Sequence, residues 1–304
     1  MMKRVLVCGS NGLLGQKLAW LFNDNSGYEV LHTSHHRSFV QSSDLVDYTQ
    51  LDVSIRSDVK SLVTSFRPDV ILNAAAIANV DLCETDREQA WKVNVTAVEN
   101  LVEVCRRIDA KLVHVSTDYV FDGKTGHYTE EDRAHPINYY GKTKLAGENV
   151  IISGGIDHAI LRTILIYGAG INVKNNFGLW LVNNLTRKQR IQCVDDQISN
   201  PTHVYDIAAA MKTSIEHNIS GMFHVCGAET ISRYDFAMKT AEIFGFDSSL
   251  IRRSKTRDIQ RPAQRPLNTS FVIEKAKKVF NYNPMNITQG LKLLQQELTG
   301  INLN

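Results

Sequence analysis

Two residues four positions apart, Tyr140 and Lys144, carry the clearest chemistry in this sequence. They lie in a stretch with helical character, and this spacing places both side chains on one helix face. A nearby ammonium favours the phenolate and lowers the pKa of a phenol from its reference value of about 10. Tyr140 is therefore a candidate proton donor to a developing alkoxide, with Lys144 tuning it and reaching a cofactor ribose. The same spacing also occurs by chance, so the motifs elsewhere in the sequence must show whether Tyr140 and Lys144 are catalytic.

A pair of hydroxyl residues lies at the end of a predicted strand, residues 111–116. Ser116 closes the strand and Thr117 follows it. In a parallel sheet the carboxyl ends of the strands face the ligand. Thr117 is therefore a candidate for polarising a substrate ketone. The alternative is that the pair caps a turn or a helix.

Three glycines, Gly9, Gly12 and Gly15, stand between the first predicted strand (residues 4–8) and the first predicted helix (residues 13–22). The first allows a tight turn, the second lets the backbone approach a pyrophosphate, and the third lets helix and strand pack closely. The helix N-terminus then offers free N–H groups and the positive end of its dipole. This pattern predicts a dinucleotide site, although three glycines also occur in ordinary strand-to-helix turns.

Two further segments are candidate cofactor contacts. Asp52 can hydrogen-bond an adenine, or it can belong to the N-cap region of the helix that follows. Residues 74–76 are three alanines at the end of the predicted strand 70–73. Small side chains there leave space for a cofactor, and tight packing is the competing interpretation.

The choice of nicotinamide cofactor depends on the end of the second predicted strand, residues 28–33. An acidic residue there would bind the ribose hydroxyls of NAD, but this sequence has Thr33. Arg37 can pair bidentately with a 2′-phosphate. NADPH is therefore the expected cofactor and NADH a possible one; the alternative is a solvated loop whose basic residues bind nothing specific. Adjacent His35 and His36 diverge, and we expect no metal site.

The composition narrows the class of protein. The 304 residues are 43% hydrophobic and 22% charged, with a net charge of +2 and no basic tail or stripe. These values argue against a disordered chain, a nucleic-acid-binding protein and a membrane-surface protein. No apolar run is long enough for a transmembrane helix. Five widely spaced cysteines without a C-x-x-C pair predict neither a disulfide framework nor a zinc site and favour a cytoplasmic location.

Strand and helix patterns alternate through the first half of the chain, which predicts parallel strands joined by right-handed crossovers. We therefore expect an α/β fold with a doubly wound parallel sheet of the Rossmann type. Residues 1–164 form the predicted NAD(P)-binding domain. Residues 165–304 form a smaller α/β C-terminal substrate lobe, with a return of some segments to the core left open. Residues 84–108 are expected to form one long helix, and residues 252–268 a long loop.

Several motifs resemble those of the extended short-chain dehydrogenase/reductases, and within them the dTDP-4-dehydrorhamnose reductases. The resemblance runs over most of the chain. It is most specific in Ser-Thr-Asp-Tyr-Val-Phe from residue 116 and in Tyr-Gly-Lys-Thr-Lys from residue 140. The other matching segments are residues 9–15, 73–81, 138–148, 162–163, 175–177, 200–202 and 265–269.

This resemblance implies roles for individual residues. The implied catalytic set is Thr117, Tyr140 and Lys144. The implied cofactor contacts, besides Tyr140 and Lys144, are Gly9, Asn11, Gly12, Leu13, Leu14, Asp52, Val53, Ala74, Ala75 and Ala76. The implied sugar-nucleotide site is lined by Thr117, Asp118, Tyr119, Phe121, Asn176 and Arg265.

The implied reaction is the NADPH-dependent reduction of the 4-keto group of dTDP-4-dehydro-L-rhamnose to give dTDP-L-rhamnose, in a possible homodimer. The family often has an aromatic residue at the position of Leu165, which cannot stack on a sugar, so the exact sugar is left open. One alternative is another nucleotide-sugar reductase or epimerase. The other is a non-catalytic NADP-binding regulatory subunit, because residues 201–204 and 221–224 resemble the beta subunit of methionine adenosyltransferase.

Overall fold

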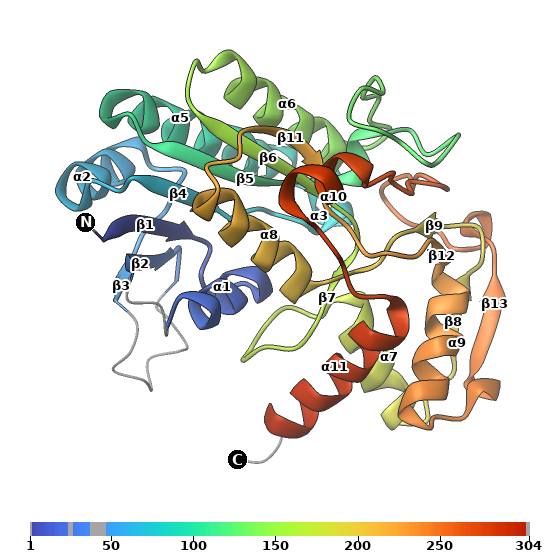
Figure 1. Ribbon diagram of the computed structural model, residues 1–304. Coiled ribbons are helices and arrows are strands. Elements are labelled where there is room, and N and C mark those ends of the chain that lie inside the picture. The colour runs from blue at the N-terminus through green and yellow to red at the C-terminus, as the bar shows by residue number, and fades with distance from the viewer. Residues whose placement is uncertain (1, 24–26, 37–46, 302–304) are drawn as a thin grey trace.

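The structure is a computed structural model that describes residues 2–23, 27–36 and 47–301. Among these residues, seven parallel strands form a sheet with the order β11-β6-β5-β4-β1-β2-β3 (Figure 1). The strands are β1 (Lys3–Cys8), β2 (Tyr28–Ser34), β3 (Tyr48–Gln50), β4 (Val70–Asn73), β5 (Lys111–Thr117), β6 (His158–Thr163) and β11 (Gly221–His224). The order runs outward from β1 in both directions, and the prediction of a doubly wound parallel sheet is confirmed.

Helices cover both faces of the sheet. Successive residues of the inner strand β1 point to opposite faces and pack under both helical layers. Val5 packs into one apolar cluster and Leu6 into the other, and both are fully buried. The first cluster includes α1 (Leu13–Asn23), α8 (Val204–Glu216) and α10 (Glu274–Phe280). The second includes α2 (Arg56–Phe66), α5 (Ala97–Ile108) and α6 (Tyr139–Ser153). None of the helices in the described part of the chain is long and apolar enough to cross a membrane.

The long helix predicted over residues 84–108 is confirmed for residues 87–108, which are helical without a break, but it starts later than predicted. α3 (Val80–Thr85) ends just before Asp86, whose side chain accepts a hydrogen bond from Gln89 N at 3.1 Å. Aspartate is a favoured N-cap residue, and here it starts a new helix, α4 (Arg87–Trp91). The chain thereby turns between α3 and α4 beside the carboxyl end of the sheet.

Part of the C-terminal half of the chain returns to the sheet. β11 pairs in parallel with β6, and α8 packs against α1. Residues 204–224 therefore belong to the main sheet and its helical layer, although they follow the predicted boundary at residue 164. This return depends on pairing between distant segments, which a local pattern does not reveal.

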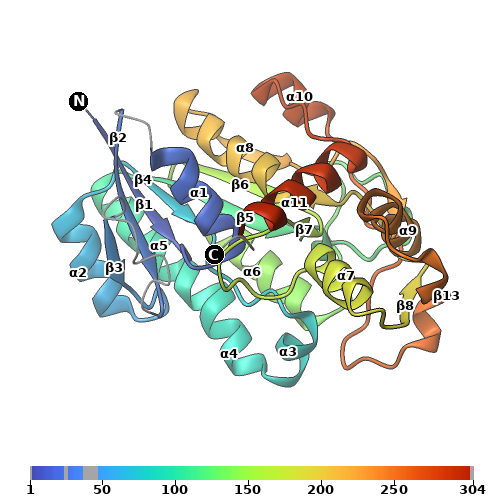
Figure 2. The same ribbon diagram turned by 90° about the horizontal axis from the view of Figure 1, so that it is seen from below.

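The remaining C-terminal elements form a separate lobe (Figure 2). This lobe has its own apolar cluster. Its helices are α7 (Phe177–Thr186), α9 (Arg233–Phe244) and α11 (Ile287–Ile301). Its short strands pair as β7 (Ile166–Tyr167) with β10 (Thr202–His203), β8 (Ile191–Val194) with β13 (Ile251–Ser254), and β9 (Ile198–Ser199) with β12 (Ile231–Ser232). β13 takes the first three residues of the predicted loop over residues 252–268, and apart from a short 3₁₀ turn (Thr256–Asp258) the rest is irregular as predicted.

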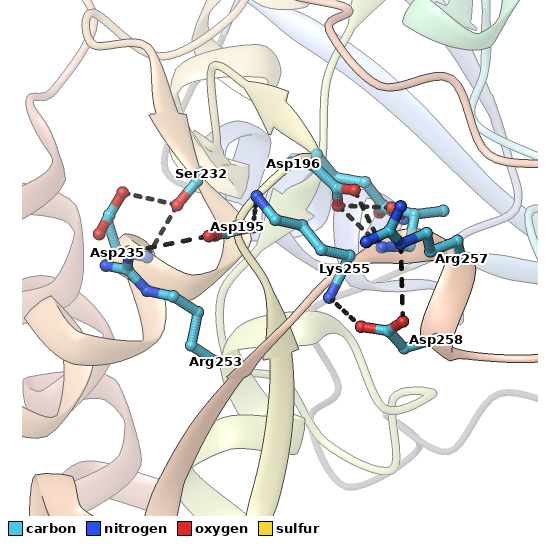
Figure 3. A network of polar contacts seen from close by, with 10 residues as sticks. Asp195, Asp196, Ser232, Asp235, Arg253, Lys255, Arg257 and Asp258 are labelled. Carbon is cyan, nitrogen blue, oxygen red and sulfur yellow. Dashed lines mark hydrogen bonds and ion pairs between the residues drawn. The ribbon is translucent and has the colours of Figure 1, made fainter.

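A polar network fixes the chain where it leaves β13 (Figure 3). Asp195 lies 2.7 Å from Nζ of Lys255. Asp196 accepts hydrogen bonds from N and Oγ1 of Thr256 at 2.9 and 2.7 Å. Exposed ion pairs add little stability. The main effect of this network is therefore to hold the chain in place after β13. It determines where residues 259–268 begin, and these residues lead back toward α3.

A buried ion pair joins α6 to the sheet. Nε and Nη2 of Arg162, on β6, donate to the two carboxylate oxygens of Glu148, on α6, at 2.9 and 2.7 Å. The side chains are 4% and 0% exposed. The guanidinium also lies 5.2 Å from the centre of the Phe121 ring. Neither charge reaches water, so each depends on the other for stabilisation.

Removing one partner of this pair should destabilise the protein strongly. Glu148→Gln leaves the charge of Arg162 buried without a counter-ion, and we expect a loss of about 3–5 kcal/mol in the free energy of unfolding. The double variant Glu148→Gln/Arg162→Met removes both charges and should recover much of that loss. Urea unfolding followed by circular dichroism measures both effects.

The matched control is Arg56→Met, which breaks an exposed ion pair with Glu103. It should cost far less stability than Glu148→Gln, because an exposed ion pair contributes little. A Glu148→Gln protein as stable as this control would contradict a coupled buried pair.

Candidate active site

The glycine loop brings the end of β1 against the segment that follows β4. Gly9 has a φ of +88°, and a Cβ there would lie 2.8 Å from Ala75 N. A Cβ at Gly15 would lie 2.3 Å from Gly9 O, so neither position accepts a side chain. α1 begins at Leu13 with no acidic residue in its first turn, which leaves the positive end of its dipole without an internal counter-charge. These features fit the pyrophosphate of a dinucleotide.

Thr33 supports this loop from the neighbouring strand. Its carbonyl accepts hydrogen bonds from the N–H groups of Gly9 and Ser10 at 2.8 and 2.9 Å. Its hydroxyl donates to Val7 O at 3.0 Å. Thr33 is fully buried and is followed in β2 only by Ser34, so the strand ends without an acid. Arg37, predicted to bind a 2′-phosphate, lies outside the described residues, and its role stays a prediction.

Asp52 takes part in a turn before α2. Its Oδ1 accepts hydrogen bonds from N and Oγ of Ser54 at 2.9 and 2.6 Å. Its Oδ2 lies 3.4 Å from Nε2 of His35. The N-cap of α2 is Ile55, so Asp52 shapes the turn without capping the helix. The predicted contact with adenine stays a prediction.

The other residues predicted to contact the cofactor lie around the glycine loop and differ in how exposed they are. Leu14 is 7% exposed and belongs to the apolar cluster beneath α1, whereas Ala76 is exposed. Val53 is buried, and its carbonyl accepts a hydrogen bond from Asn100 at 3.1 Å. Asn11 donates from Nδ2 to His36 O at 3.2 Å. Small and backbone groups thus line the loop, and Leu14 lies inward.

The structure brings Thr117, Tyr140 and Lys144 together at the carboxyl end of β5. The hydroxyl of Tyr140 lies near that of Thr117, and this contact lowers the pKa of the phenol. Nζ of Lys144 donates to Val115 O at 2.8 Å. The Tyr119 ring meets the Tyr140 ring edge-on, with centroids 5.8 Å apart. In parallel sheets this edge is where ligands bind.

Burial reverses the electrostatics expected for this pair. It raises the pKa of Tyr140 well above its ordinary value, and the contact with Thr117 opposes this only in part. Burial also lowers the pKa of Lys144 to about 8, against the opposing effect of Glu148. The sequence predicted a phenol with a lowered pKa, whereas the structure keeps the phenol protonated at neutral pH. A protonated phenol is the form that a general acid needs.

Asn94 is a site residue that the sequence analysis missed. It lies in a π-helical turn (Lys92–Thr96) between α4 and α5, and such turns often mark functional sites. Its Nδ2 donates to Thr143 Oγ1 at 3.0 Å, and its Oδ1 accepts from Ile77 N at 2.9 Å. Asn94 therefore joins α6 to the segment that carries the three alanines. No short motif signals this bridge between distant segments.

Asp118 is buried next to the three candidate catalytic residues. It accepts hydrogen bonds from the hydroxyls of Thr117, at 3.0 Å, and Thr269. Burial raises the pKa of Asp118 to about 6, and these hydroxyl bonds oppose the rise. Asp118 thus orients the Thr117 hydroxyl.

Two residues predicted to line the substrate site have structural roles instead. Phe121 is fully buried and stacks on Tyr128, with ring centroids 4.2 Å apart. Asn176 caps α7, because its Oδ1 accepts from Leu179 N at 3.1 Å and its Nδ2 donates to Gly168 O at 2.8 Å. Both side chains are committed within the protein, and we remove them from the candidate substrate set.

Arg265, predicted to bind a diphosphate, forms a bidentate ion pair with Asp81 of α3. Nη1 and Nη2 lie 3.0 and 2.8 Å from the two carboxylate oxygens, and the guanidinium side chain is 9% exposed. The pair fixes the loop of residues 259–268 against α3. The two residues are 184 positions apart, so the sequence analysis did not foresee this partner.

Arg233, the first residue of α9, was not predicted. Its guanidinium lies 4.9 Å from the centre of the Phe177 ring. Burial lowers its pKa, and the charges that act on it include Asp118, Arg261 and Arg265. The described part of the chain provides no carboxylate in ion-pair contact with it. Arg233 is therefore a better candidate than Arg265 for binding an anionic group beside Asp118.

Leu165 replaces the aromatic residue that the family often has beside the sugar, and it forms the turn after β6. It has a φ of +40°, which residues other than glycine rarely adopt. Its carbonyl accepts a hydrogen bond from Thr202 N at 3.2 Å. Its side chain packs against the first apolar cluster, which includes α1 and α8. Its observed contacts are structural.

The fold and this site define a Rossmann-like dinucleotide-binding protein with a tyrosine and a lysine on the helix beside the sheet edge. The family model described as RmlD substrate binding domain matches residues 2–299. The chain belongs to this family.

Three known proteins show how close the similarity is. The chain is 34% identical over 303 residues to dTDP-4-dehydrorhamnose reductase from Aggregatibacter actinomycetemcomitans, covering 96% of this chain and 98% of that protein. It is 33% identical over 256 residues to methionine adenosyltransferase 2 subunit beta from Xenopus laevis, covering 82% and 75%. The crystal structure of dTDP-4-dehydrorhamnose reductase from Bacillus anthracis str. Ames in complex with NADP has a TM-score of 0.83 and 27% identity, covering 98% and 100%. The resemblance predicted from the motifs is confirmed.

Replacing Tyr140 by phenylalanine should remove the proton donor and keep the ring. We expect kcat to fall on the order of 10²-fold or more, as for loss of a general acid, measured as NADPH oxidation with a keto-sugar nucleotide. Tyr139→Phe is the matched control, since that ring lies against Arg87 at 5.0 Å, and it should leave kcat unchanged. Near-normal turnover by a folded Tyr140→Phe protein would rule out this role.

Proposed function

We propose that the chain is an NADPH-dependent reductase that converts dTDP-4-dehydro-L-rhamnose to dTDP-L-rhamnose. The observation that carries this proposal is the meeting of Thr117, Tyr140 and Lys144 at the sheet edge that also carries the glycine loop. The relative at 34% identity, named as a dTDP-4-dehydrorhamnose reductase, supports the choice of substrate.

Each residue of the site has a separate role in the proposed reduction of a ketone. When bound, NADPH supplies a hydride to the carbonyl carbon. With substrate bound, the Thr117 hydroxyl turns its one proton from Asp118 to the carbonyl oxygen and stabilises the charge that develops there. Tyr140 gives its proton to that oxygen, so the ketone becomes an alcohol and the tyrosine a phenolate. Lys144 positions Tyr140 and is the proposed contact for the cofactor ribose.

The preference for NADPH is proposed from the end of β2. That strand ends without an acid that would repel a 2′-phosphate, and Arg37 follows it in the sequence. The relative from Bacillus anthracis was crystallised with NADP, which supports the same choice.

Arg37→Ala should weaken NADPH selectively. Loss of a charge-assisted hydrogen bond costs roughly 1.5–3 kcal/mol, so the KM for NADPH should rise about tenfold or more. The KM for NADH should stay the same, because NADH has no 2′-phosphate. Equal changes for the two cofactors would show that Arg37 does not bind this group.

We further propose that Arg233 binds the diphosphate of the sugar nucleotide. A guanidinium suits phosphate oxygens, and Arg233 lies near Asp118 with Arg261 and Arg265 close enough to act on it. Much of the binding energy would then come from the nucleotide, at a distance from the reacting carbon.

Free dTDP should therefore compete with the sugar nucleotide and not with NADPH. Arg233→Met should raise the inhibition constant of dTDP about tenfold or more, for loss of a charged hydrogen bond. Arg257→Met is the control, since that side chain is 87% exposed on the same lobe, and it should leave the constant unchanged. Failure of millimolar dTDP to inhibit, with simple ketones reduced equally well, would overturn the nucleotide-sugar assignment.

A second candidate function is a non-catalytic regulatory subunit. The 33% identical relative named methionine adenosyltransferase 2 subunit beta supports it. A panel of 4-keto sugar nucleotides separates the two functions. The reductase proposal predicts NADPH oxidation with at least one of them, and turnover with none would favour the regulatory subunit.

A further inference from the structure

Three polar groups form a buried chain beside the candidate proton donor. His114 of β5 is 1% exposed. Its Nδ1 lies 3.0 Å from Nδ2 of Asn73, and its Nε2 lies 3.0 Å from Nζ of Lys144. Asn73 ends β4, so the chain of contacts runs from β4 through β5 to α6. The order of donors and acceptors along it determines where the protons lie.

A backbone group determines the direction of the Asn73 amide. The N–H of Ala75, which can only donate, lies 3.1 Å from Oδ1 of Asn73. The donor nitrogen Nδ2 therefore faces His114. Nδ1 of His114 must accept this hydrogen bond and carries no proton.

A neutral imidazole has one proton, so His114 carries it on Nε2. The imidazolium is excluded because its Nδ1–H would oppose the amide N–H, and burial lowers the pKa of His114 well below its ordinary value. The Nε2–H therefore faces Nζ of Lys144. An ammonium has no lone pair to accept this bond, whereas an amine has one. The amine still has an N–H for Val115 O, at 2.8 Å.

We propose that Asn73 and His114 hold Lys144 as an uncharged amine when no cofactor is bound. Both are positioning residues, because they act on the reacting groups through Lys144. Without an ammonium beside it, Tyr140 remains a phenol, which is the form that donates a proton during reduction. This last consequence rests on the proposed reductase function, whereas the protonation state of Lys144 does not.

The other groups that face Lys144 do not restore its charge. Glu148, one turn further along α6, favours the ammonium, but its carboxylate is engaged by Arg162. Burial raises the pKa of Cys83, on α3, to about 11, so this thiol is uncharged at neutral pH. Burial lowers the pKa of Lys144 to about 8, against the opposing effects of Glu148 and Cys83. The Nε2–H of His114 lowers it further, because only the amine accepts that bond.

NMR on the full chain without cofactor tests this proposal directly. In protein labelled with ¹⁵N-histidine, the ring nitrogen shifts of His114 should identify the Nε2–H tautomer, with the signal assigned by its loss in His114→Gln. In protein labelled with ¹³C-lysine, Lys144 should titrate below neutral pH, because only then is it an uncharged amine at neutral pH. A proton on Nδ1 of His114, or a Lys144 that titrates above neutral pH, would overturn the proposal.

Asn73→Asp should reverse the order of donors in the chain. A carboxylate accepts a bond from Nδ1–H, so the imidazole proton moves to Nδ1 and Nε2 accepts from an ammonium. The pKa of Lys144 should then rise by about one unit or more. The alkaline limb of kcat/KM should move to lower pH, because the ammonium eases ionisation of Tyr140.

Asn79→Asp is the matched control, because it adds the same charge at the N-cap of α3. It should change neither the tautomer nor the titration. An unchanged His114 tautomer in a folded Asn73→Asp protein would contradict the proposal. Absence of reductase activity in a protein with the expected tautomer would refute the proposed function alone, so the two failures are distinguishable.

Discussion

The ion pair between Glu148 and Arg162 is the interaction on which the geometry of the site depends. It joins α6, which carries Tyr140 and Lys144, to β6, which lies next to β5 and Thr117. A fully buried ion pair contributes little net stability, because desolvation offsets the attraction. Its effect here is to fix α6 along the sheet, so that a phenol on the helix meets a hydroxyl on the strand.

A second constraint is the close approach of backbone segments around the glycine loop. Gly9 and Gly15 let β1, α1 and the segment after β4 come together, and Thr33 holds the loop from the side. Asn94 connects the segment after β4 to α6. The predicted dinucleotide site and the candidate catalytic helix are thus joined by hydrogen bonds of the Asn94 side chain.

The parts of the fold that depend on local pattern could be predicted from the sequence. Short apolar strands alternating with helices indicated the parallel sheet, and the spacing of Tyr140 and Lys144 placed them on one helix face. Features that join distant segments could not be predicted. The return of β11 to the sheet, the pairing of Arg265 with Asp81 and the position of Arg233 all depend on the folded chain.

The electrostatic prediction failed for a related reason. The sequence places a lysine near Tyr140, but it does not reveal how deeply both are buried. In the structure burial raises the pKa of Tyr140, and its contact with Thr117 only partly opposes that rise. Likewise, Asn176 and Phe121 match motifs whose side chains the folded structure uses for capping and packing.

Transfer of deuterium tests the central claim most directly, which is that this site reduces the 4-keto group of a nucleotide-linked sugar. The protein is incubated with dTDP-4-dehydro-L-rhamnose and NADPH that carries deuterium at the transferred position, and the product is examined by NMR and mass spectrometry. The account predicts one deuterium, bound to C4 of the sugar. Recovery of unreduced sugar, or deuterium at any other carbon, would contradict it.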